Sequence, residues 1–146
     1  MKLDDILQDF LGEAEERFQS MESALVTLER HPENAGVLEN LFRALHSLKG
    51  ACGFLGFCRL AALAHAGENL LSSLRQGDVR MTARHAALLL GAVDAMRAVV
   101  AAIAATGGEP QTVRDVAEKQ LLAALAAAAR GAGFDVPLRT ARPQTA

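Results

Sequence analysis

Six residues in the middle of the chain have side chains and a spacing that could support nucleophilic chemistry. They are His46, Lys49, Gly50 and Gly53, followed by His65 and Glu68. A neutral imidazole is a good nucleophile and ordinarily titrates near pH 6.5. A carboxylate bonded to one ring nitrogen fixes the tautomer, leaves the other nitrogen free for attack and stabilises the cation that forms. A nearby ammonium can hold the oxygens of a transferred phosphoryl group.

The face on which His46 lies follows from helical periodicity. Apolar residues at steps of three and four predict a helix around His46 whose apolar stripe centres near Leu45 and Cys52. His46 falls about 120° from that centre and therefore points outward. Gly50 and Gly53 share its face, although each costs a helix interior roughly 0.5–1 kcal/mol relative to alanine. They leave a bare surface beside the imidazole, or, as an alternative reading of Gly53, admit a neighbouring helix.

A second helix is expected to bring a carboxylate to the same level. The chain turns near Gly56, ten residues after His46, and His65 and Glu68 follow nine and twelve residues after the turn. Because the rise is about 1.5 Å per residue, all three side chains lie within one turn of the same level in an antiparallel pair. Glu68 can lean toward His46, whereas His65 lies nearly opposite its own apolar stripe. Each residue alone is an ordinary surface residue, and only their joint placement predicts a site.

The elements that must hold these residues are all helical. Periodicity, helix caps and the Pro and Gly breaks predict helices over about 3–30, 34–54, 58–76, 82–105 and 112–130. Short loops favour an all-α, up-down antiparallel four-helix bundle with an additional C-terminal fifth helix. The expected organisation is a bundle over 1–106, a linker and fifth helix over 107–131, and a tail over 132–146 that starts an interdomain linker.

The composition of the chain excludes several classes of function. The chain has 146 residues, 51% of them hydrophobic, and a net charge of −2. We therefore expect one domain with no general attraction to nucleic acid or to anionic membranes. Cys52 and Cys58 fit no zinc or redox spacing, and the N-terminus lacks a signal-peptide core, so a cytoplasmic protein or fragment is expected. The chain contains neither a P-loop nor a G-x-G-x-x-G motif, so it is not expected to bind ATP itself.

Residues 41–82 read LFRALHSLKGACGFLGFCRLAALAHAGENLLSSLRQGDVRMT. This segment resembles the core of a histidine phosphotransfer (HPt) domain, and more closely the N-terminal phosphotransfer domain of CheA-type chemotaxis histidine kinases. The specific signals are an H-x-x-K-G motif at His46 followed by H-x-x-E-N at His65, and the likeness spans about residues 3–105. The departures, such as Phe54 and Leu55, leave the polar residues unchanged.

The resemblance implies a phosphoryl carrier. His46 would accept the γ-phosphoryl group of ATP from a separate kinase domain and pass it to an aspartate of a CheY- or CheB-like response regulator. Glu68 would be its hydrogen-bonding partner, and Lys49 and His65 would complete the polar network. No cofactor is expected in this domain, because the kinase domain would bind ATP and the response regulator would bind Mg²⁺.

The same resemblance implies the partners and location. The histidine kinase catalytic domain and a response regulator receiver domain are the expected partners, with no nucleic acid and no membrane. The fragment would be monomeric, whereas the parent kinase would be dimeric and located in chemoreceptor clusters in the cytoplasm. The regulator is expected to dock beside His46, on Gly50 and Gly53. Because the first helix runs antiparallel to the second, its residues at the level of His46 lie around Phe18, so Leu11, Glu15 and Phe18 are expected to complete the docking surface.

Two alternatives to phosphoryl transfer stay open. The chain could be a helical docking bundle, such as a relative that has lost activity. It could also be a metal-binding bundle that uses His46, His65 and Glu68, although di-metal bundles point their Glu-x-x-His sets into the core. His31 and His85 are interpreted as ordinary surface residues.

Overall fold

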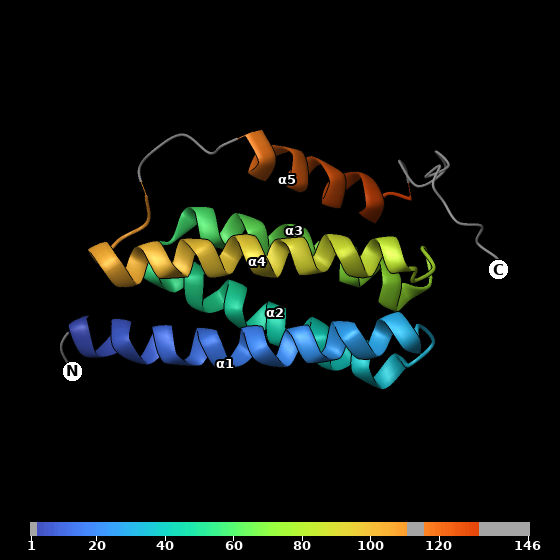
Figure 1. Cartoon of the computed structure of the whole chain (residues 1–146), viewed down its shortest axis with the longest axis horizontal. Helices are drawn as coiled ribbons and strands as arrows, with labels where there is room; N and C mark the ends of the chain where they lie inside the picture. The colour runs from blue at the N-terminus through green and yellow to red at the C-terminus, as the bar shows by residue number, and fades with distance from the viewer. Residues whose placement is uncertain (1–2, 111–115, 132–146) are drawn as a thin grey trace.

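The computed structural model describes residues 3–110 and 116–131, and these fold into five α-helices (Figure 1). The helices are α1 (Leu3–Arg30), α2 (Ala35–Leu55), α3 (Cys58–Gln76), α4 (Ala83–Thr106) and α5 (Val116–Ala129). Helices α1 to α4 form an antiparallel bundle in which α1 and α3 each pack against both α2 and α4. The predicted fold class, a four-helix bundle with an additional fifth helix, is confirmed.

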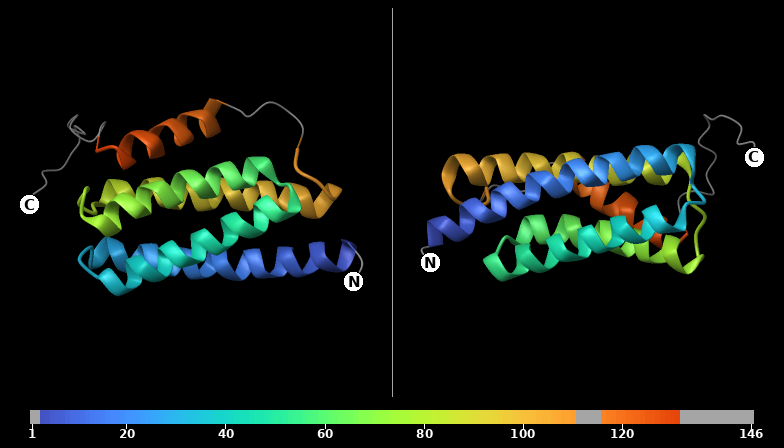
Figure 2. Two further views of the ribbon diagram at one scale, coloured as in Figure 1. Left: turned by 180° about the vertical axis from the view of Figure 1, so that it is seen from behind. Right: turned by 90° about the horizontal axis from the view of Figure 1, so that it is seen from below.

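A two-residue turn joins α2 to α3 and sets their register. Gly56 adopts a left-handed conformation with φ 80°, and its N–H bonds back to α2, which ends the helix there. Phe57 is buried and α3 begins at the next residue. Because the turn is so short, α2 and α3 run side by side over their whole length (Figure 2).

Close packing between α2 and α3 depends on a glycine in α3. A Cβ atom at Gly67 would lie 2.8 Å from Cδ2 of Leu45, closer than such atoms approach in proteins. Gly67 therefore lets α3 approach α2 closely. Because Gly67 directly precedes Glu68 and Leu45 directly precedes His46, this close approach lies next to both residues. Cys52 is also buried here, and burial raises the pKa of its thiol to about 12, so that it stays protonated and unreactive.

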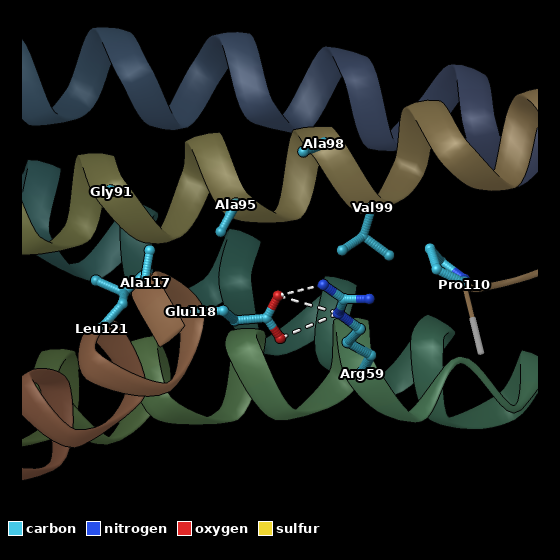
Figure 3. Close-up of a pocket in the computed structure, with 9 residues that line it drawn as sticks. All are labelled: Arg59, Gly91, Ala95, Ala98, Val99, Pro110, Ala117, Glu118 and Leu121. Carbon is cyan, nitrogen blue, oxygen red and sulfur yellow. Dashed lines mark hydrogen bonds and ion pairs between the residues drawn. The ribbon is translucent and has the colours of Figure 1, made fainter. Parts of the chain in front are cut away.

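Helix α5 packs outside the bundle, on α3 and α4. The guanidinium of Arg59 donates to both carboxylate oxygens of Glu118 at 2.8–3.1 Å, and Ser73 Oγ donates to the carbonyl of Ala129 at 2.7 Å. A cavity of about 300 Å³ lies between α5, α3 and α4 beside the Arg59–Glu118 pair (Figure 3). The predicted tail over 132–146 lies outside the described residues.

The loop after α4 also contacts the start of α3. The Glu109 carboxylate accepts the backbone N–H groups of Arg59 at 3.0 Å and Leu60 at 2.6 Å. These donors have no partners within their own helix, and a negative charge complements the helix dipole at this end. Glu109 therefore caps α3 from a distant part of the chain.

The interpretation of His85 as a surface residue is wrong. His85 is only 2% exposed, because it is the third residue of α4 and closes a capping box with Thr82. The backbone N–H of Thr82 donates to Nδ1 of His85 at 3.1 Å, so Nδ1 must be unprotonated. Burial, together with the positive charge of Arg84, lowers the pKa of His85 to about 4.

The buried His85 makes folding stability depend on pH. Between the ordinary imidazole pKa of 6.5 and the folded value of about 4, the unfolded chain binds a proton that the folded chain does not. We expect His85 to reduce the free energy of unfolding as pH falls through this range, by on the order of 3 kcal/mol in total. Urea unfolding at pH 7 and pH 4.5 measures the loss.

The control for this pH dependence is His85→Gln, because glutamine can also close a capping box but does not titrate. Carboxylates titrate in both proteins, so the difference between their losses of stability from pH 7 to pH 4.5 gives the contribution of His85. An equal loss of stability in the wild type and in His85→Gln would contradict the prediction.

Candidate functional site

The exposed imidazole of His46 is bonded to a buried carboxylate. The His46 side chain is 61% exposed on α2, whereas the Glu68 side chain on α3 is only 9% exposed. Nδ1 of His46 donates a hydrogen bond to Oε2 of Glu68. Because an ionised carboxylate can only accept, Nδ1 carries the ring proton and Nε2 carries the lone pair. The predicted proximity of His46 and Glu68 is confirmed.

Lys49 completes a network of three charged or polar side chains. Its Nζ donates to Oε1, the second oxygen of Glu68. Burial alone would raise the pKa of Glu68, but the hydrogen bonds from Lys49 and His46 outweigh it and hold the pKa below its ordinary value. Glu68 is therefore ionised at neutral pH, with one oxygen committed to each partner.

The other residues predicted beside His46 have different surroundings. Gly50 and Gly53 are exposed, and a Cβ atom at either would meet no neighbouring group within 4 Å. They do not admit a neighbouring helix, so the alternative interpretation of Gly53 is wrong. His65 is exposed on α3 and makes no hydrogen bond or ion pair with another of the described residues. The structure does not bring His65 into the network of His46, Lys49 and Glu68.

Sequence reasoning missed an aromatic contact of His46. The rings of His46 and Phe42 are stacked, with centroids 6.0 Å apart and planes inclined by 12°. The guanidinium carbon of Arg75 on α3 lies 4.0 Å from the centroid of the Phe42 ring. The i, i+4 spacing of Phe42 and His46 was a signal for this contact, since such residues are neighbours on a helix.

Of the docking residues predicted on α1, Phe18 is wrong, whereas Leu11 and Glu15 lie on the edge of α1 away from α2 and stay predictions. Phe18 is completely buried in the core and offers no surface to a partner. Glu15 accepts from Arg97 of α4 at 3.1 Å, which places it on the edge of α1 that faces α4. Leu11 lies one turn earlier on that edge. The opposite edge, which borders α2, instead carries Ile6, Asp9 and Glu13.

The metal-binding alternative finds no support in this geometry. Within residues 3–110 and 116–131, no three His, Cys, Asp or Glu side chains are grouped so that they could hold a metal ion. Both oxygens of Glu68 are already bonded to nitrogen donors.

Comparison with known proteins agrees with the architecture. The Hpt domain family model matches residues 5–131. The chain belongs to the Hpt domain family. It is 36% identical over 116 residues to the chemotaxis protein CheA of Halobacterium salinarum, covering 80% of this chain and 17% of that protein. It is 31% identical over 119 residues to CheA of Bacillus subtilis, covering 82% of this chain and 18% of that protein.

Solved structures of similar Hpt domains have the same fold. The phosphorylated P1 domain of CheA3, in a crystal structure with CheY6 from R. sphaeroides, superimposes with a TM-score of 0.80 at 26% identity, over 90% of this chain and all of that chain. The solution structure of the histidine phosphotransfer domain of CheA gives a TM-score of 0.77 at 27% identity, over 86% and 92% of the two chains. This Hpt chain spans less than a fifth of the length of the two CheA relatives.

Proposed function

We propose that this Hpt domain carries a phosphoryl group on Nε2 of His46. The observation that supports it best is the hydrogen bond from His46 Nδ1 to the buried carboxylate of Glu68, which leaves the lone pair on Nε2 of a largely exposed side chain. Nε2 attacks the γ-phosphorus of ATP held by a separate kinase domain, an N–P bond forms, and ADP departs with the electrons of the broken P–O bond. The ring becomes cationic while Nδ1 keeps its proton, and the negative charge of Glu68 stabilises it.

The proposed reaction also uses Lys49 and two partner domains, a kinase domain and a receiver domain. An ammonium has three donors, so Lys49 can bond to Glu68 and still offer N–H groups to phosphoryl oxygens. The chain itself would need no cofactor: ATP belongs to the kinase domain, and Mg²⁺ to the receiver domain whose aspartate takes the group. His65, one turn before Glu68, would contact the phosphoryl group or the partner rather than His46.

The similarity to CheA supports the wider setting. The P1 domain of CheA3 is phosphorylated and lies in complex with CheY6. By that likeness, a response regulator receives the phosphoryl group here too, and the parent chain is a dimeric, cytoplasmic histidine kinase of chemoreceptor clusters. Helix α4 is long and apolar enough to cross a membrane by length and composition alone, but its buried residues form part of the core of the bundle.

The proposal is tested by labelling with a CheA-type kinase catalytic core and radioactive ATP. We expect acid-labile, base-stable label on the wild type and none on His46→Gln, with receiver domains then removing the label. Absence of label on the folded wild type, with several competent kinase cores, would favour the docking bundle instead.

The bare surface next to His46 gives a separate prediction. Gly50→Ala and Gly53→Ala should each stabilise the protein by about 0.5–1 kcal/mol, because both glycines lie inside α2 with open space around them. The added methyl group should nevertheless slow transfer to the receiver domain several-fold, since it occupies the surface that a partner must approach. Urea unfolding and the rate of label loss measure the two effects.

Gly12 provides the matched control, because it lies inside α1 and also has open space where a Cβ would be. Gly12→Ala should stabilise the protein without changing transfer. Transfer at the wild-type rate in both Gly50→Ala and Gly53→Ala would show that partners do not approach over this surface.

A further inference from the structure

We propose that Phe42, Arg75 and Glu39 form a positioning stack that holds the plane of the His46 ring for phosphoryl transfer. The inference rests on the proposed function and extends it to three residues that do not touch the reacting nitrogen. The stack starts from Glu39 and Phe42 on α2 and from Arg75 on α3.

The first layer of the stack is the contact between two rings. Phe42 and His46 lie one turn apart on α2, and long helical side chains lean toward the preceding turn, which places the imidazole next to the phenyl ring. Their planes are inclined by 12° and their centroids are 6.0 Å apart, within the range of offset-stacked aromatic pairs. Phe42 is half-buried, so its own position is restrained by the surrounding residues.

The second layer is a cation over the phenyl ring. The guanidinium carbon of Arg75 lies 4.0 Å from the Phe42 centroid, well inside the distance of a cation–π contact. Arg75 is itself held by Glu39, since Nε donates to Oε1 at 2.8 Å and the terminal nitrogen donates to Oε2 at 3.4 Å. This two-point contact fixes the guanidinium plane and ties α3 to α2 two turns before His46.

The stack supplies a restraint that Glu68 cannot supply alone. The bond from Nδ1 to Glu68 fixes one atom of the ring, but the ring can still rock about that bond and swing Nε2 through an arc. A contact with the face of the ring removes this motion. Together the two contacts define where the Nε2 lone pair points, and in-line attack on phosphorus depends on that direction.

The arrangement favours positioning over electrostatic activation. The charge of Arg75 is directed at the Phe42 ring and balanced by Glu39, so it is not aimed at Nε2. Arg43 donates to the same Glu39 carboxylate at 3.3 Å but makes no ring contact within the described part of the chain. Arg43 is therefore a matched control: it shares the charge and the partner, but not the stack.

The test compares Phe42→Leu and Arg75→Gln with Arg43→Gln in the whole chain. The first readout is the kinetics of His46 labelling by a CheA-type kinase core. We expect Phe42→Leu to lower kcat about tenfold with little change in KM, Arg75→Gln to lower it several-fold, and Arg43→Gln to leave it unchanged. Phe42→Tyr, which keeps the ring, should restore the rate.

The second readout is NMR of the imidazole, which reports ring motion from the widths of its signals without any phosphorylation. The proton should stay on Nδ1 in the wild type and in the stack variants, because the bond to Glu68 is kept, but Phe42→Leu should broaden the ring signals. Wild-type kcat and wild-type signal widths in both folded stack variants would overturn the positioning stack.

The two readouts separate failure of the stack from failure of the proposed function. If the wild type were never labelled, the phosphoryl-carrier function would fail, while the widths of the ring signals in the wild type and the variants would still decide whether the stack holds the ring. If Phe42→Leu did not fold, Arg75→Gln would decide the question, because Arg75 lies at the surface.

Discussion

Glu68→Gln is expected to slow phosphorylation of His46 by about 10²-fold or more. Glutamine fits the site and can still accept the proton of His46 Nδ1, so the ring keeps a hydrogen bond. It lacks the negative charge that stabilises the imidazolium formed when Nε2 attacks phosphorus. It also leaves the half-buried ammonium of Lys49 facing a neutral amide. The variant should therefore have a lower kcat and a nearly unchanged KM, because the attraction between the Glu68 charge and the ring strengthens in the transition state.

The measurement is the initial rate of label incorporation from a kinase core, with circular dichroism to confirm that the variant is folded. Glu15→Gln is the matched control: it also removes a carboxylate from an ion pair, with Arg97, but on the α1–α4 side of the bundle. The control should be labelled at the wild-type rate. If Glu68→Gln were labelled as fast as Glu15→Gln, the charge of Glu68 would have no part in the reaction.

Phe18→Ala is expected to destabilise the fold by about 3–5 kcal/mol. The Phe18 ring is fully buried in the middle of α1, where that helix packs against α2 and α4. Alanine would lose the apolar contacts of the ring and leave a cavity that the surrounding core side chains cannot fill without moving. The guanidinium of Arg97, 5.6 Å from the ring centroid, would also lose its aromatic contact.

Chemical unfolding in urea measures this loss, and Val26→Ala on the same helix is the control. Val26 is half exposed, so its truncation should change stability far less. A loss below 1 kcal/mol in Phe18→Ala would show that the ring is not part of the core. Weaker regulator binding by Phe18→Ala would report unfolding, not a lost docking contact.

The core of the site was predictable because it depends on one helix pair. Periodicity places His46 outside the apolar stripe, and a short turn at Gly56 brings Glu68 to the same level. Neither step needs knowledge of the other helices. The positions of His46, Glu68 and Lys49 follow from local geometry, whereas their chemical roles stay predictions that the labelling experiments test.

The contacts of α1 were not predictable in the same way. A helical wheel shows which side of α1 is apolar, but not whether a given edge borders α2 or α4. That choice is set by the handedness with which the four helices close around the core, and it places Leu11 and Glu15 on the edge that borders α4. Phe18 lies at the centre of the buried side because both neighbouring helices cover it.

The surroundings of His85 and Arg75 depend on structural detail that the periodicity of apolar residues does not contain. His85 looked polar and exposed on a wheel, but the first turn of a helix uses side chains to satisfy its free N–H groups, and this one is buried. The contact of Arg75 with Phe42 depends on side-chain rotamers and on the rotation of α3. Neither the burial of His85 nor the contact of Arg75 follows from the spacing of apolar residues.

The two-residue turn between α2 and α3 has a consequence for how this domain can diversify. Every side chain of the network and of the stack belongs to the continuous stretch from Glu39 to Arg75. The reacting centre thus belongs to one helical hairpin, α2 and α3, and α1, α4 and α5 support it without contributing a side chain to it. Substitutions at exposed positions of α1, α4 and α5 therefore leave every contact of the network and of the stack in place, so these three helices can change in sequence without rebuilding the reacting centre.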